Sequence, residues 1–163
     1  MTDPPDGPGL APGKGRWQIS STVRTSAPVE VVWPLIGEAE RWREWAWMTR
    51  TFLLRPGAPE ADGVGALRRF GIGPVGGSRE EVVAWEPPHH LGYVVVSGLP
   101  VRRYRSDVVL EGDALGTVIR WDGSFDALVP GTGPGLRMVL QRMVGGFARR
   151  VGRYAESLGS GGD

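Results

Sequence analysis

A glycine-rich segment, GIGPVG at residues 71–76, is the first pattern in this chain that could do chemistry. It matches GxGxxG, which cradles the phosphates of a dinucleotide when it joins a strand to a helix and leaves its amide groups free. Pro74 removes one of these amides, and the following residues 78–85 predict a strand. We therefore expect a hairpin loop here, and the sequence predicts no cofactor.

The two histidines, His89 and His90, are the remaining candidates for metal binding or nucleophilic catalysis. Adjacent residues of an extended chain point in opposite directions, so this pair is poorly placed to hold one ion. The chain has no cysteine, and we predict no metal site and no Ser-His-Asp triad. We expect both histidines at the rim of a turn. Glu80 and Glu81 also point in opposite directions, which argues against a paired acid and base.

Length and charge set the class of protein. The chain has 163 residues, which favours one domain, and 19 basic against 18 acidic residues give no reason to expect nucleic acid as a partner. No apolar run approaches the roughly 18 residues of a membrane span, and the first residues lack the apolar core of a signal peptide. We expect a soluble, cytoplasmic protein with disordered tails at residues 1–16 and 159–163 and a single domain at 17–158.

The pattern of apolar residues predicts seven strands, two short helices and one long helix. Strands are expected at 17–25, 47–54, 64–70, 78–85, 91–97, 102–110 and 117–125, with the short helices between residues 26 and 47. Pro34 should keep the first of these helices short or bent. The long helix should run from about residue 134 to 158, although Gly145 and Gly146 interrupt it. Short connections between the later strands predict an antiparallel sheet.

Alternation along the strands divides them into a wet face and a dry face. It places Arg103 and Arg105 on the wet side, and it does not decide between Arg68 and Arg69. A space between the dry face and the long helix would be lined by residues that we predict to bind a ligand: Tyr93, Val95, Tyr104, Ser106, Val108, Trp121, Phe125, Met143 and Phe147. Aliphatic members of this set could equally fill a core. Buried hydroxyl and indole groups, however, need a partner, which in a cavity can be water or a ligand.

The order of these elements resembles the helix-grip, START-like superfamily, also called SRPBCC. Within it the sequence is most similar to the polyketide cyclase/dehydrase-like family. The residues that carry the likeness are SAPVEVVW at 26–33, ERWREW at 40–45, GVG at 63–65, REEVVAWEPP at 79–88 with LGY at 91–93, and GTVIRW at 116–121. The resemblance implies an α+β fold of the START/Bet v 1 kind, in which a seven-stranded antiparallel sheet curves around a long C-terminal helix.

The resemblance also implies a hydrophobic small-molecule ligand, with an apolar or aromatic body, held between sheet and helix. A polyketide cyclase, aromatase or dehydratase would have to polarise a carbonyl or relay a proton, and the candidates are Tyr104 with Tyr93 or Arg68. A carrier or sensor without catalysis is an alternative, and a chaperone-partner module of the activator-of-Hsp90 type is another. The sequence leaves open whether the chain is an enzyme and whether it is a monomer or a homodimer.

Overall fold

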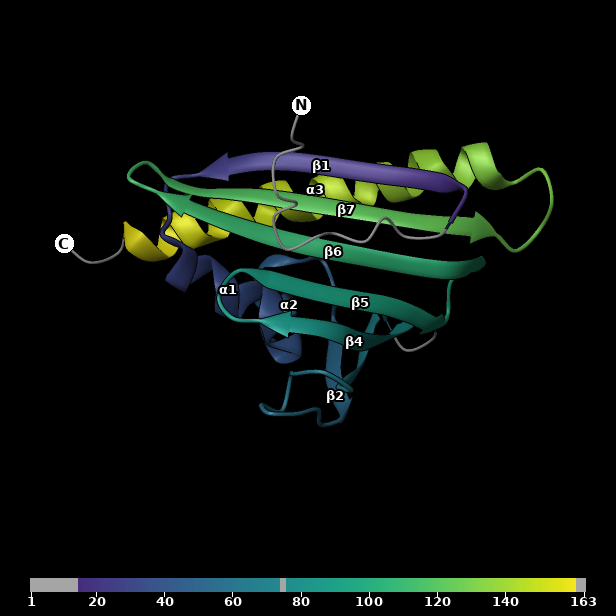
Figure 1. The fold of residues 1–163 in the computed structure, drawn as a ribbon, viewed down its shortest axis with the longest axis horizontal. Helices are drawn as coiled ribbons and strands as arrows, with labels where there is room; N and C mark the ends of the chain where they lie inside the picture. The colour runs from purple at the N-terminus through teal and green to yellow at the C-terminus, as the bar shows by residue number, and fades with distance from the viewer. Residues whose placement is uncertain (1–14, 74–75, 161–163) are drawn as a thin grey trace, which may run out of the picture.

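A computed structural model of the chain describes residues 15–73 and 76–160. One antiparallel sheet carries seven strands in the order β1-β7-β6-β5-β4-β3-β2, and a long helix lies behind it (Figure 1). The strands are β1 (Trp17–Thr25), β2 (Arg50–Arg55), β3 (Leu67–Gly71), β4 (Ser78–Glu86), β5 (His90–Ser97), β6 (Val101–Asp113) and β7 (Gly116–Ala127). The helical elements are α1 (Val29–Gly37), the 3-10 turn η1 (Ala39–Arg41), α2 (Trp42–Trp45) and α3 (Gly133–Gly159). The predicted α+β helix-grip fold is therefore confirmed.

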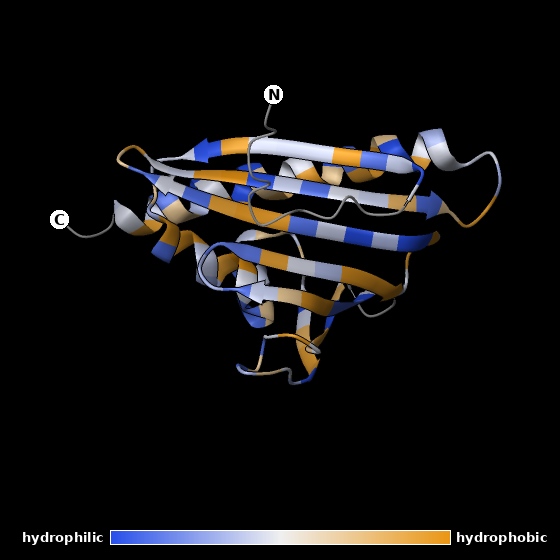
Figure 2. Cartoon of the chain, in the orientation of Figure 1, coloured by the Kyte–Doolittle hydropathy of each residue, from blue (hydrophilic) through white to orange (hydrophobic). Residues whose placement is uncertain are grey.

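The first strand of the chain, β1, pairs with the last strand, β7, at one edge of the sheet. β1 runs antiparallel to β7 along its whole length, from the Trp17–Phe125 pair to the Thr25–Thr117 pair. The β6–β7 hairpin turns at Gly116, whose φ of 123° is in the region that favours glycine. Figure 2 shows polar and apolar residues mixed along the strands. In β7 the buried Thr117, Ile119 and Trp121 alternate with less buried residues, the period of two that gives a sheet one dry face.

Strand ends differ from the prediction by a few residues. β2 begins at Arg50 rather than at residue 47, and β3 begins at Leu67 because the chain still turns at Gly63 and Gly65. β6 contains an irregularity between Arg102 and Arg105, where Arg103 has a positive φ of 49°. Arg105 and Arg103 both make ion pairs with acids of the sheet, as expected for the wet face.

The short helices form a plug whose hydrogen bonds are completed by tryptophan. α1 contains Pro34 and is nine residues long, in agreement with the prediction of a short helix. The carbonyl groups near its end accept hydrogen bonds from two buried indole N–H groups. Trp42 donates to the carbonyl of Ile36 and Trp45 to that of Leu35, both at 2.9 Å. These bonds satisfy helix-end acceptors that would otherwise lack partners.

Helix α3 packs on one side of the sheet, against β1 and β7. Its buried face includes Leu140, Val144, Phe147 and Val151. The helix continues through Gly145 and Gly146 without a break.

At both ends of the domain the chain is held to the sheet. The side chain of Thr25 donates to the carbonyl of Gly152, and the carboxylate of Glu156 accepts from the backbone of Ser26, each at 3.0 Å. Gly15 and Arg16 belong to the predicted tail, yet their backbone amides donate to Ser124 and Asp126 of β7. The rest of the two predicted tails, residues 1–14 and 161–163, lies outside the described residues.

Two glycines of α3 should respond in opposite ways to alanine. A Cβ at Gly146 would meet the ring of Trp47 at 3.7 Å, an ordinary contact, so Gly146→Ala should raise the free energy of unfolding by about 0.5–1 kcal/mol. A Cβ at Gly133 would lie 2.3 Å from the ring of Trp17, so Gly133→Ala should lower it by roughly 1–3 kcal/mol. Urea unfolding of both variants checks this, and a destabilising Gly146→Ala would contradict the packing described.

Candidate ligand-binding cavity

A cavity of about 300 Å³ lies between the dry face of the sheet and the helices. Its walls come from α2, β3, β4, β5, β6 and α3 and from the loops beside them. The lining residues are Trp42, Trp47, Met48, Phe70, Gly71, Ile72, Gly77, Ser78, Glu80, Tyr93, Val95, Gly98, Leu99, Tyr104, Met143 and Phe147. Trp47 and Ile72 are exposed, so the cavity reaches the surface at these two residues.

Aromatic rings form much of the wall and hold one another in place. Trp47 stacks on Phe147 with ring centroids 4.8 Å apart, and Trp42 meets the same phenyl ring edge-on at 5.4 Å. Trp42 also packs against Phe70 at 4.7 Å. Because each ring is fixed by neighbours, the wall keeps its shape without a ligand. Such a surface suits a flat apolar ligand.

The wall of the cavity contains the carboxyl group of Glu80, which lies beside the buried guanidinium of Arg68. Arg68 of β3 and Glu80 of β4 are directly paired across the sheet. The guanidinium is fully buried and lies over the rings of Phe70, Tyr93 and Trp42, at 5.2, 5.5 and 5.9 Å from their centroids. It donates to the Glu80 carboxylate and to the carbonyl of Gly37, both at 3.4 Å. Of the two neighbouring arginines, the structure therefore places Arg68 on the dry face.

Glu80 is the lining residue with a shifted pKa near neutrality. Burial raises its pKa from 4.5 to about 7, and the charge and hydrogen bond of Arg68 and the hydroxyl of Ser78 only partly oppose this. The long N–O distance to Arg68 agrees with a weak opposing effect. Glu80 can therefore hold or release a proton under physiological conditions, which is a property of acid–base groups.

The two tyrosines of the wall are neutral hydrogen-bonding groups. Burial raises the pKa of Tyr93 and of Tyr104, and the charge of Glu80 raises both further. The indole N–H of Trp121 lies 3.1 Å from both the Tyr93 hydroxyl and the Ser106 hydroxyl, and Ser106 itself donates to the carbonyl of Asp122 at 2.8 Å. This chain of bonds fixes Tyr93 at the edge of the cavity.

The structure sorts the predicted ligand-binding residues into two layers. Tyr93, Val95, Tyr104, Met143 and Phe147 line the cavity, and their role in binding stays a prediction. The other four, Ser106, Val108, Trp121 and Phe125, are not at the wall and need correction as lining residues. Their side chains are buried in the layer behind it, where the polar atoms of Ser106 and Trp121 find partners within the protein.

Arg68, the third predicted catalytic residue, also lies outside the lining set. Its guanidinium contacts Glu80, and Glu80 forms part of the wall, so Arg68 can act on a ligand only through Glu80. Glu80 itself was not among the site residues predicted from the sequence. The signal was alternation on its own strand, because Glu80 shares a face with Val82, which is fully buried.

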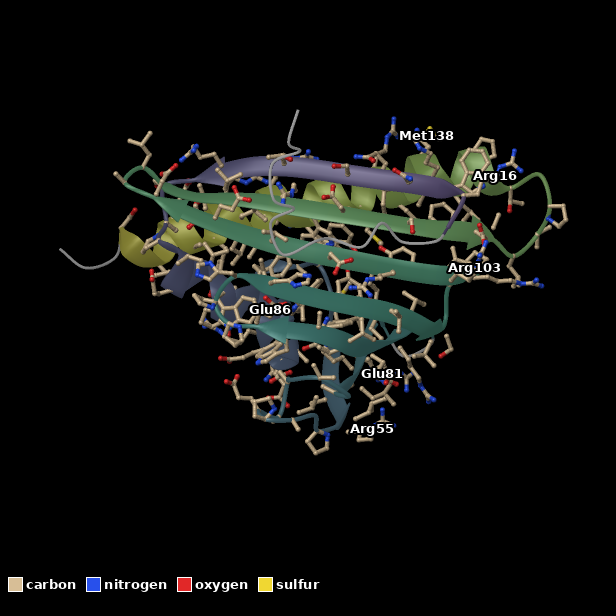
Figure 3. All side chains as sticks on the ribbon, viewed as in Figure 1. Arg16, Arg55, Glu81, Glu86, Arg103 and Met138 are labelled. Carbon is tan, nitrogen blue, oxygen red and sulfur yellow. The ribbon has the colours of Figure 1, made fainter. Side chains whose placement is uncertain are left out.

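Glu81, the neighbour of Glu80, lies on the opposite face of β4. Its carboxylate accepts from Arg55 at 3.2 Å on the outer surface, where both side chains are visible (Figure 3). The prediction that the two glutamates do not act together agrees with this arrangement.

The histidines occupy the wet face rather than the cavity. His90 is buried, and its ring nitrogens face two carboxylates, Asp107 at 2.8 Å and Glu86 at 3.3 Å. The hydrogen bond to Asp107 raises the His90 pKa despite burial. His89 contacts the carbonyl of Leu110. In residues 15–73 and 76–160 no group of three His, Cys, Asp or Glu residues could hold a metal ion.

Residues 16–156 match a family described as polyketide cyclase / dehydrase and lipid transport. The chain belongs to this family. A START superfamily protein from Mycobacterium smegmatis is 14% identical, with a TM-score of 0.74 over 87% of this chain and 99% of that one. A protein from Thermobifida fusca is 25% identical, with a TM-score of 0.67 over 83% and 93%.

DynU16, from the dynemicin biosynthetic locus, is 22% identical, with a TM-score of 0.63 over 86% of this chain and 47% of that one. No curated protein matches the chain at a significant level. In the described part of the chain, no helix is long and apolar enough to cross a membrane. Family and fold together indicate a ligand-binding helix-grip domain.

Glu80 should make the stability of the protein depend on pH. Its folded pKa of about 7 lies above the ordinary 4.5, so its contribution is fully present below pH 4.5 and is lost as pH rises to 7. The loss should be on the order of 3 kcal/mol. Glu80→Gln, which resembles the protonated acid, should remove this part of the pH dependence. Urea unfolding between pH 4.5 and 8 measures it.

A matched control is Glu81→Gln on the opposite face of β4, which should leave the pH profile unchanged. The raised pKa of His90 also lowers stability as pH rises, and this remaining slope should persist in both variants. Identical profiles for Glu80→Gln and the unaltered protein would show that Glu80 does not titrate near neutrality.

Proposed function

We propose that this protein binds an apolar, aromatic small molecule with few oxygen atoms in the cavity between sheet and helix. The observation that carries the proposal is the aromatic wall of Trp42, Trp47, Phe70 and Phe147, fixed by mutual packing around a space of about 300 Å³. Binding pockets of this class are largely apolar with a few placed polar groups. Family membership supports the same conclusion.

The size of the cavity limits the ligand. Small-molecule sites commonly measure about 300–1,000 Å³, and this one is at the lower end. A molecule of two or three fused rings, or a short folded chain, suits this volume. A bulkier ligand would have to extend past Trp47 and Ile72 to the surface.

A cyclase, aromatase or dehydratase is the catalytic form of the proposal. Glu80 favours it, because a carboxyl group with a pKa near 7 beside two neutral tyrosines is an arrangement suited to proton transfer. Tyr104 and Tyr93 would donate hydrogen bonds to a ligand carbonyl, and Arg68 would act by positioning Glu80. A carrier or sensor would use the same cavity and release its ligand unchanged.

Filling the cavity tests the binding proposal. Val95 lines the cavity, whereas Val96, the next residue of β5, is 56% exposed. Val95→Trp should weaken the binding of naphthalene at least tenfold, because the indole occupies its space, and Val96→Trp should leave it unchanged. Equilibrium dialysis gives both affinities. A chaperone-partner module would use its outer surface and would not bind naphthalene.

Removing one hydroxyl tests the carbonyl-binding role of Tyr104. Tyr104→Phe should weaken the binding of 2-acetonaphthone about five- to tenfold, the usual value of one hydrogen bond, and leave naphthalene unaffected. The comparison uses equilibrium dialysis of both compounds. Equal losses for the two ligands would mean that the substitution changed the packing of the wall and that the hydroxyl does not contact a carbonyl.

A further inference from the structure

Glu80 is the carboxyl group that the cavity presents to a ligand. Of the lining residues in the described chain it alone carries a carboxyl, and 12% of its side chain is accessible, against none for Arg68 behind it. Val95 lies beside it on β5 and Arg68 on β3, since both are paired with it across the sheet. A ligand in the cavity can therefore contact the carboxyl group of Glu80 but not the guanidinium of Arg68.

The hydrogen-bonding capacity of Glu80 is incompletely used. Its partners are the guanidinium of Arg68 at 3.4 Å and the hydroxyl of Ser78 at 3.5 Å. Both distances exceed the usual 2.7–3.2 Å, and a carboxylate has about four acceptor sites. A buried carboxylate with such long bonds is stabilised when a further donor approaches.

The surroundings of Glu80 restrict what that donor can be. The fixed positive charge of Arg68 disfavours an ammonium group at this place, and the carboxylate disfavours an anion. A neutral hydroxyl meets neither penalty.

We propose that the ligand carries a phenolic or enolic hydroxyl that donates to Glu80, while its apolar body lies between Trp42, Phe70 and Phe147. This inference rests on the proposed function and names the class of ligand. It also makes Glu80 the residue that selects among flat apolar molecules of similar size.

Hydroxyl selection should depend on pH, because within residues 15–73 and 76–160 the elements around Glu80 contribute no other group that titrates near neutrality. β3 contributes the guanidinium of Arg68, and β4 contributes the hydroxyl of Ser78. β5 and β6 contribute Tyr93 and Tyr104, which stay neutral because burial raises each pKa. The helices contribute the uncharged Trp42, Met143 and Phe147. The carboxylate form accepts a stronger hydrogen bond than the acid form, so selection for a hydroxyl should grow as pH rises.

The experiment compares 2-naphthol with naphthalene by equilibrium dialysis at pH 5.5 and pH 8.5. Both compounds are uncharged in this range, since a phenol ionises near pH 10 or slightly below. The ratio of their dissociation constants isolates the hydroxyl. This ratio should favour 2-naphthol about tenfold more at pH 8.5 than at pH 5.5. Glu80→Gln should abolish the pH dependence of the ratio, and Glu81→Gln, the outward neighbour, should preserve it.

The possible failures are distinguishable. If naphthalene does not bind the unaltered protein, the proposed function is wrong. If naphthalene binds but the ratio is the same at both pH values, the cavity exists and the inference about Glu80 is overturned. Should Glu80→Gln not fold, the pH titration of the unaltered protein still decides. The double variant Arg68→Met with Glu80→Gln, which removes both charges, then takes the place of the single variant. Its ratio of dissociation constants should not depend on pH.

Discussion

Helix α3 covers only the end of the sheet formed by β1 and β7, and the rest of this structure depends on that constraint. The helix packs on β1 and β7 and touches the short helices, whereas β3, β4 and β5 have little or no contact with it. A seven-stranded twisted sheet is too wide for one helix to cover. The uncovered strands must bury their dry faces against something else, and α2 supplies only part of it through Trp42. A cavity lined by large rings is the result.

Burying the Arg68–Glu80 pair inside this domain costs free energy. Removing two charges from water costs several kcal/mol each, and a buried pair is often no more stable than apolar residues of the same volume. Here the N–O distance is long, and Arg68 gains instead from the faces of three aromatic rings. A fold that needed only stability would be served as well by leucine and methionine at these two positions. The pair is therefore better explained by what Glu80 presents to the cavity than by any contribution to folding.

The order of elements made the fold predictable from the sequence, because a strand, two short helices, six strands and a long helix leave few ways to build an antiparallel sheet. The residues that line the cavity were harder to predict. Alternation showed correctly that Trp121 and Ser106 face inward, but their partners, Tyr93 and Asp122, are distant in the chain or become adjacent only through pairing of strands. Facing inward is thus not the same as reaching a cavity. Glu80 was missed for a related reason: its charge suggested the wet face, although Val82 on the same side of β4 is fully buried.

The hydrogen bonds behind the wall explain why the polar groups of the cavity can be selective. Trp121 is fully buried, and its N–H lies between the hydroxyls of Tyr93 and Ser106. Ser106 is in turn bonded to the backbone of β7, so Tyr93 is fixed to the sheet through two side chains. Glu80 has no such set of short bonds, and its two contacts are long. Of the polar groups at the wall, Tyr93 therefore already accepts one hydrogen bond before a ligand arrives, whereas Glu80 gains a short bond only when a donor approaches. A ligand that cannot donate a hydrogen bond fills the same space but leaves that gain unrealised, and this difference is what would let the cavity distinguish molecules of equal size.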